Sequence, residues 1–166
     1  MSRAVMLSIR PKWCEKIISG EKTVEIRKNS PKLGTPFRCY IYSTQSGVAL
    51  GAWRKHGKVI GEFTCDRIFP INVFDNGSIQ NWFFEHMERS CLTYEELADY
   101  IGNDRTGYGW HISDLKIYDK PKELSKFERP YECNECDAKW ATECNACHEE
   151  GKIKRPPQSW CYVEEI

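Results

Sequence analysis

Long apolar runs are missing from this 166-residue sequence. No segment reaches the roughly 20 apolar residues that a membrane-spanning helix needs. The first residues, MSRAVMLSIRPKW, also lack the continuous apolar stretch of a secretory signal peptide. We therefore expect a soluble cytoplasmic protein that has no membrane partner.

Net charge is also absent, because 24 Lys and Arg residues balance 24 Asp and Glu residues. Taken alone, this balance argues against a protein that coats nucleic acid. The charges are unevenly distributed, however. Residues 1–58 hold twelve basic residues against three acids, whereas residues 59–166 hold twelve against twenty-one. The first third forms a basic side of the fold if it stays together, and the charges mix if the two segments interleave.

The remaining composition is that of an ordinary globular domain, with 40 % apolar and 13 % aromatic residues. Pro11 and Gly20 have the positions of a first helical residue and a helix end, and Thr93 with Glu96 forms a capping-box pattern. Another helix is predicted to start at Ser78. Patterns typical of strands occur in residues 4–9, 22–28, 37–44, 57–71, 107–119 and 159–166. These elements predict an α+β fold, most plausibly a small mixed β-barrel with peripheral helices.

Nine cysteines do not indicate a disulfide scaffold here, because their number is odd and two CxxC pairs lie close together. Two such turns supply the four thiolates that tetrahedral zinc prefers, and four thiolates leave no open position for catalysis. We therefore predict a structural zinc site, with His148 as an alternative ligand and with unpaired or redox-active cysteines as the competing interpretation. The predicted ligands are Cys133, Cys136, Cys144 and Cys147.

These cysteines lie in a segment that is bracketed by prolines, and we interpret residues 129–155 as an insertion in a barrel made of residues 1–128 and 156–166. Residues 131–150 carry six acids and one lysine, which is the wrong charge for holding phosphate. The insertion is predicted to clamp the fold or to contact a protein partner.

The segment KTVEIR is the first candidate site. In a strand, Thr23, Glu25 and Arg27 share a face, and Lys22 lies at its start. A carboxylate between two cations can orient them and can keep a lysine ready to carry protons. The alternative is an exposed strand whose outer face is simply charged.

The segment GYGWHIS is the second candidate site. Tyr108 and Trp110 alternate with glycine and lie on one face, where flat rings near cations can stack an unpaired base. The alternative is that these aromatic residues belong to the core and that His111 is an ordinary, hydrogen-bonded histidine.

The order SIRPKWCEKIISGEKTVEIRK, CYIYST, GYGWHISDL and RPPQSWCYVEE resembles the ASCH domain family, in particular its short bacterial and phage members. The resemblance implies a PUA-like fold, a small barrel whose relatives bind RNA or read modified bases. It places Lys22, Glu25 and Arg27 in the wall of a ligand cleft. Together with the alternation above, it gives Lys22, Thr23, Glu25, Arg27, Tyr108, Trp110 and His111 as candidate ligand-binding residues.

One subgroup of small ASCH proteins hydrolyses the acetyl group of N-acetylated cytidine, using a lysine, a threonine two residues before an arginine, and a later glutamate. Lys22 and Arg27 match that motif, and Glu88 is a loose counterpart of the later glutamate. The threonine position holds Glu25, however, so the catalytic hydroxyl is missing. Glu25 could instead act as a general base on water, with Lys22 or Arg27 holding the oxyanion.

Three functions follow from these patterns. The first is a module that binds RNA, single-stranded nucleic acid or a modified nucleoside. The second is an amidohydrolase that deacylates a nucleoside, with Lys22 and Glu25 as catalytic residues. The third is a phage or host interaction protein that contacts its partner through the acidic zinc insertion.

Overall fold

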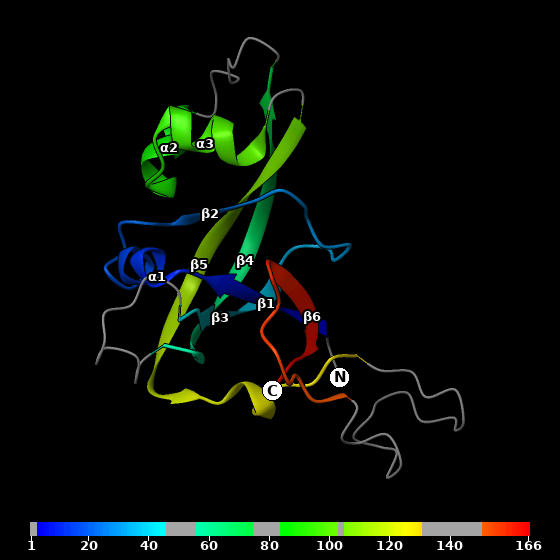
Figure 1. Ribbon diagram of the computed structural model, residues 1–166. Coiled ribbons are helices and arrows are strands. Elements are labelled where there is room, and N and C mark those ends of the chain that lie inside the picture. Colours follow the sequence, from blue (N-terminus) through cyan, green and yellow to red (C-terminus); the bar gives the residue numbers. More distant parts are fainter. Residues whose placement is uncertain (1–2, 46–55, 75–83, 103–104, 131–150) are drawn as a thin grey trace. The chain divides into compact units, whose positions relative to one another are not determined.

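The computed structural model describes residues 3–45, 56–74, 84–102, 105–130 and 151–166 (Figure 1). They form a mixed sheet with a few helices. In chain order the elements are β1 (Arg3–Ile9), α1 (Pro11–Ile18), β2 (Val24–Arg27), β3 (Phe37–Ser43), β4 (Lys58–Val73), α2 (Phe84–Ser90), α3 (Tyr94–Ile101), β5 (Arg105–Lys122) and β6 (Trp160–Glu164). No helix of these residues is long and apolar enough to cross a membrane.

The helix boundaries follow local chemistry. Pro11 opens α1, and Gly20 follows its end with φ of +79°, a conformation that glycine adopts without strain. The Thr93 side chain accepts a hydrogen bond from Glu96 N, and the Glu96 carboxylate accepts one from Thr93 N, so the predicted capping box is present. Ser78, the predicted start of another helix, lies outside the described residues.

The six strands are hydrogen-bonded in the order β2-β5-β4-β3-β1-β6. The α+β prediction is confirmed, but the expectation of a closed barrel is wrong, because the described part of the chain contains no pairing between the edge strands β2 and β6. Other segments occupy those edges. Thr23 N donates to Arg89 O at 2.9 Å beside β2, and Glu164 N of β6 donates to Glu128 O at 2.9 Å.

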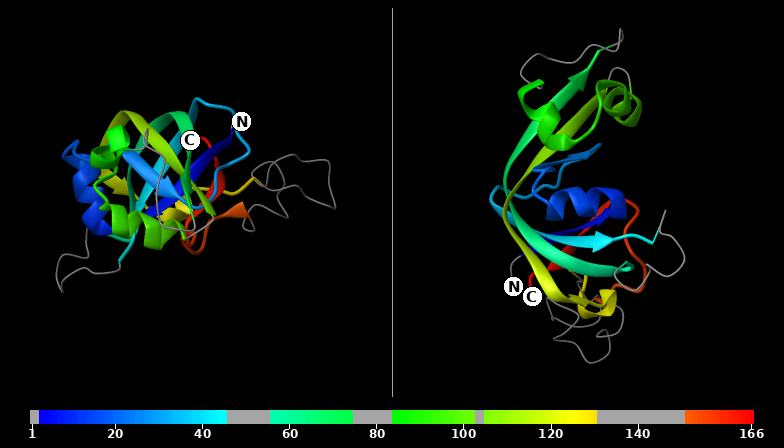
Figure 2. Two further views of the ribbon diagram at one scale, coloured as in Figure 1. Left: turned by 90° about the horizontal axis from the view of Figure 1, so that it is seen from above. Right: turned by 90° about the vertical axis from the view of Figure 1, so that its left-hand side faces the viewer.

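The chain divides into two compact units, which β4 and β5 both traverse. Unit 1 comprises Met1–Pro11, Arg38–Phe63 and Lys116–Ile166. Within it β1 is parallel to β3 and antiparallel to β6, and Figure 2 gives two further views of the ribbon. Both faces of β1 are covered, since residues 4–9 are all buried. The core of unit 1 includes Ala4, Met6, Tyr40, Tyr42, Val59, Phe127, Ile153 and Val163.

Unit 2 comprises Lys12–Phe37 and Thr64–Leu115. Here β2 pairs antiparallel with β5, and α3 packs its apolar residues on the strands. One hydrophobic cluster of its core contains Val24, Ile26, Phe69, Ile71, Val73, Leu97 and Ile101. The glycine at 109 in GYGWHIS is a packing requirement, because a Cβ atom there would collide with the Phe69 ring.

Candidate functional site

Three charged side chains of the KTVEIR segment form a buried cluster in unit 2. Lys22, Glu25 and Arg27 are 2 %, 6 % and 7 % exposed. Lys22 Nζ lies 3.3 Å from Glu25 Oε2, and Arg27 Nη2 lies 3.0 Å from Glu25 Oε1. The interpretation of this strand as a simple solvated face is therefore wrong, because water does not reach these charges and they compensate one another instead.

Lys22 is held at the end of α2. Its ammonium donates to Ser90 O at 2.7 Å and to Val24 O at 2.9 Å, in addition to its ion pair with Glu25. Ser90 is the last residue of α2, where carbonyl groups lack helical partners and a cation is favoured. The two carbonyl oxygens accept two of the three ammonium hydrogens, and the contact with Glu25 Oε2 is an ion pair and not a hydrogen bond. This geometry gives Lys22 a structural task and offers no support for Lys22 as a proton carrier.

Thr23 is fixed through its backbone. Its N–H donates to Arg89 O and its carbonyl accepts from Ile112 N, both at 2.9 Å. These two bonds join the end of α2 and strand β5 to the residue that precedes β2. The side chain of Thr23 is half-buried.

The register of β2 and β5 decides which candidate residues share a face. Glu25 lies opposite Trp110 and Arg27 lies opposite Tyr108. Directly opposed residues of an antiparallel pair point to the same side. His111 lies opposite Val24, so it belongs to the other face of the sheet and is not brought together with the charged cluster.

Trp110 is part of the core. It is fully buried, and its ring contacts Phe37 edge-on with 5.8 Å between the ring centroids. A base cannot stack on this ring in the observed arrangement. Tyr108, two residues earlier on the same face, is half-buried.

His111 pairs with an acid that the sequence did not single out. Its Nδ1 lies 2.6 Å from Asp66 Oδ1 of β4. Partial burial opposes ionisation of Asp66, but the hydrogen bond and charge of His111, with the charge of Arg67, outweigh it and hold the pKa of Asp66 below its usual value. His111 is thus a hydrogen-bonded histidine at the sheet surface.

Trp13 is the neighbour of the cluster that sequence reasoning missed. This half-buried residue of α1 has Lys12 Nζ 4.4 Å and Lys22 Nζ 5.2 Å from its ring centroid. Only the adjacency of lysine and tryptophan in RPKW could have suggested the first contact. The second requires the fold, since it joins α1 to the buried cluster.

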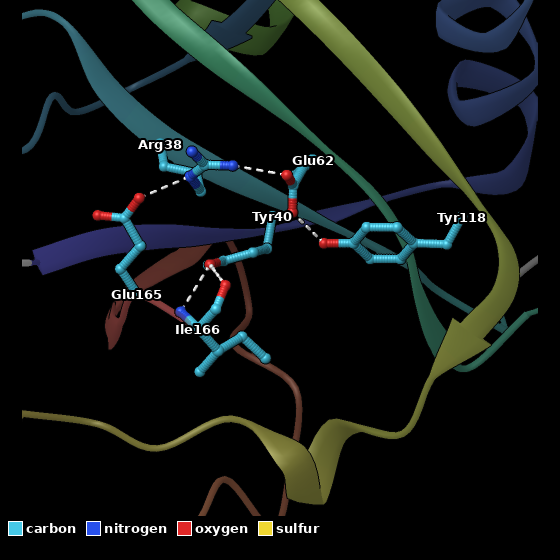
Figure 3. Close-up of polar contacts among 6 residues, drawn as sticks. All are labelled: Arg38, Tyr40, Glu62, Tyr118, Glu165 and Ile166. Carbon is cyan, nitrogen blue, oxygen red and sulfur yellow. Dashed lines mark hydrogen bonds and ion pairs between the residues drawn. The ribbon is translucent and has the colours of Figure 1, made fainter.

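A second polar cluster lies in unit 1 (Figure 3). Arg38 donates to Glu62 at 2.5 Å and to Glu165 at 2.7 Å. The Tyr118 hydroxyl donates to the other oxygen of Glu62, while the Tyr40 hydroxyl contacts the backbone of Ile166. These contacts fasten residues 165–166 to β3 and β4, so we assign this cluster to the stability of unit 1.

Stability at high pH tests this cluster. Burial, followed by the hydrogen bond and negative charge of Glu62, raises the pKa of Tyr118. The unfolded chain therefore loses the Tyr118 proton first, and the free energy of unfolding should fall as the pH rises above about 10. In the Tyr118→Phe variant, the free energy of unfolding measured by urea denaturation should fall less steeply over this pH range. The exposed Tyr100→Phe variant should keep the wild-type slope, and an equal change in both variants would refute the assignment.

The predicted zinc ligands lie outside the described residues, as does His148. Among the residues that the structure does describe, no cluster of His, Cys, Asp or Glu could hold a metal ion. The other five cysteines, Cys14, Cys39, Cys65, Cys91 and Cys161, form no disulfide among the described residues. The zinc site therefore stays a prediction.

The two ends of the predicted insertion lie side by side. Glu128 and Lys152 form an antiparallel bridge, flanked by hydrogen bonds from Arg129 N to Gly151 O and from Ile153 N to Phe127 O. The described residues on either side of positions 131–150 are therefore neighbours in unit 1, and the insertion itself stays a prediction.

Comparison with solved structures shows which proteins share this fold. The crystal structure of ASCH from Zymomonas mobilis has a TM-score of 0.63 and 20 % sequence identity, and the match covers 98 % of this chain and 88 % of that one. Two structures of single-substitution variants of the Zymomonas mobilis protein each have a TM-score of 0.62 and 20 % identity, covering 98 % of this chain and 91 % or 89 % of theirs. At this identity the likeness shows the fold alone.

Sequence comparison identifies the family. Curated proteins give no significant match. Residues 7–103 match the profile of the ASCH domain, and this range includes α1, β2 and the buried cluster. The chain belongs to the ASCH domain family.

Proposed function

We propose that this protein binds single-stranded RNA or a modified nucleobase at the surface around Trp13. The observation that carries the proposal is the half-buried Trp13 ring, with the exposed Lys12 ammonium 4.4 Å from its centroid. Aromatic rings stack unpaired bases, and neighbouring cations attract the phosphates. ASCH domains are generally similar to RNA-binding domains, which supports this class of ligand.

In this proposal the buried residues position the site instead of touching the phosphate. Glu25 holds Lys22 in place, and Arg27 holds Glu25. The exposed groups make the contacts. A second exposed pair lies on the same unit, where Lys28 Nζ is 5.2 Å from the centroid of the Tyr100 ring.

The salt dependence of binding tests the proposed role of Lys12. For single strands the logarithm of the binding constant falls with the logarithm of salt concentration by about 0.7 per neutralised phosphate. Lys12→Gln should reduce this slope by about 0.7 in fluorescence-anisotropy titrations of a labelled single-stranded RNA. Lys126→Gln removes an exposed charge in unit 1 and should leave the slope unchanged. The role of Lys12 is refuted if both variants keep the wild-type slope.

We also propose that Cys133, Cys136, Cys144 and Cys147 bind one structural zinc ion. The support is their spacing and the bridge that closes the base of the segment. Elemental analysis should find about one zinc per chain, lost in a Cys136→Ser, Cys144→Ser double variant. Cys91→Ser, outside the motif, should retain the metal. Zinc-free wild-type protein from zinc-supplemented cells would contradict the proposal.

A further inference from the structure

Unit 1 contains an open pocket of about 590 Å³ that none of the predicted sites includes. Pockets of this size accept small molecules. Among the described residues that line it are two arginines, Arg3 and Arg129, two aromatic residues, Trp160 and Tyr162, and Cys161. The other described lining residues are two prolines and a glutamine, so this part of the lining carries two positive charges and no carboxylate.

One wall of the pocket is set by the register of β1 and β6. Val5 lies opposite Tyr162 and Leu7 opposite Trp160. Arg3, which lies opposite the buried Glu164, therefore shares a face with Glu164 and with both aromatic side chains. The two rings meet edge-on, with 5.4 Å between their centroids.

Arg129 reaches the pocket from the base of the insertion. Its N–H donates to Gly151 O at 2.8 Å, and the preceding residue, Glu128, accepts a hydrogen bond from Glu164 N of β6. Burial raises the pKa of the Cys161 thiol, while the charge and hydrogen bond of the Arg129 guanidinium oppose that shift. The guanidinium is thus beside Cys161, whose side chain alternates along β6 with those of Trp160 and Tyr162, so Arg129 approaches the pocket around the edge of this strand.

The lining favours one ligand chemistry. Guanidinium groups bind phosphate oxygens in a forked geometry, and aromatic rings contact a planar base. We propose that this pocket binds a nucleotide, with Arg3 and Arg129 on the phosphate and Trp160 and Tyr162 against the base. This site is in unit 1 and is independent of the Trp13 surface in unit 2.

NMR titration of the 15N-labelled full-length protein tests the proposal. The probes are the four ribonucleoside 5′-monophosphates, the matching nucleosides, inorganic phosphate and phosphoserine. At least one monophosphate should shift the backbone signals of Arg129 and residues 158–162, and should bind more tightly than its nucleoside, phosphate or phosphoserine. Equal binding of phosphate or phosphoserine would overturn the proposal, because the base would then contribute nothing. No shift with any monophosphate at millimolar concentration would overturn it too.

Charge-removing variants identify the phosphate ligands. Arg129→Gln should weaken binding of the monophosphate about 10- to 150-fold, which is the effect of losing a hydrogen bond to a charged group. Arg3→Gln, at the exposed start of β1, should weaken it similarly and provides a second test should Arg129→Gln misfold. Arg155→Gln removes an exposed charge outside the lining and is the matched control. Equal affinity in all three variants would overturn the assignment of the arginines.

Discussion

Trp13→Leu should weaken binding of single-stranded RNA by about 5- to 150-fold, because stacking on one aromatic ring contributes about 1–3 kcal/mol per base. Leucine keeps an apolar side chain on α1, so the packing of this half-buried position is largely preserved. Anisotropy titrations at one fixed salt concentration measure the loss directly.

Phe74→Leu is the matched control for this prediction. Phe74 is an aromatic residue of the same unit, and it is 45 % exposed. Removing its ring should leave the affinity unchanged. If Phe74→Leu and Trp13→Leu weaken binding by the same factor, the RNA contacts exposed aromatic side chains in general and not the Trp13 site.

Glu25→Gln should lower the free energy of unfolding by about 3–5 kcal/mol, which is the usual effect of removing one partner from a buried ion pair. Glutamine has nearly the same volume, so the effect would come from charge. Without the carboxylate, the buried ammonium of Lys22 and guanidinium of Arg27 lose the negative charge that each of them contacts in this cluster. Urea denaturation at neutral pH measures the change.

An exposed ion pair between α1 and the turn before β2 provides the control. Lys16 Nζ lies 2.8 Å from Glu21 Oε2, and both side chains are accessible to solvent. Exposed pairs contribute little to stability. Glu21→Gln should therefore leave the urea midpoint nearly unchanged. If Glu25→Gln shifted the midpoint no further than Glu21→Gln does, the buried cluster would not stabilise the fold.

The sequence predicted the helices and strands better than it predicted whether the sheet closes into a barrel. Alternation, Pro11, Gly20 and the Thr93 capping box are local signals, and each corresponds to an observed strand, helix start or helix end. Whether the sheet closes depends on what covers its edges. That role falls to backbone groups of Arg89 and Glu128, which no side-chain pattern reveals.

The sequence predicted which residues make up the candidate site, but it did not predict that they are buried. Strand alternation placed Glu25 and Arg27 on one face, which the register shows. It could not show that this face is buried, because burial of Lys22 depends on Ser90, 68 residues away in the chain. The same limit applies to His111, whose partner Asp66 lies on another strand and whose face is opposite to that of Trp110.

The most direct measurement follows the indole N–H signal of Trp13 while single-stranded RNA is added to the 15N-labelled protein. The Trp13→Leu spectrum assigns that signal among the six tryptophans. We predict that it shifts and saturates at the RNA concentration at which anisotropy reports binding. RNA that binds while the Trp13 signal stays in place, or RNA that does not bind at low salt, would contradict the proposed function.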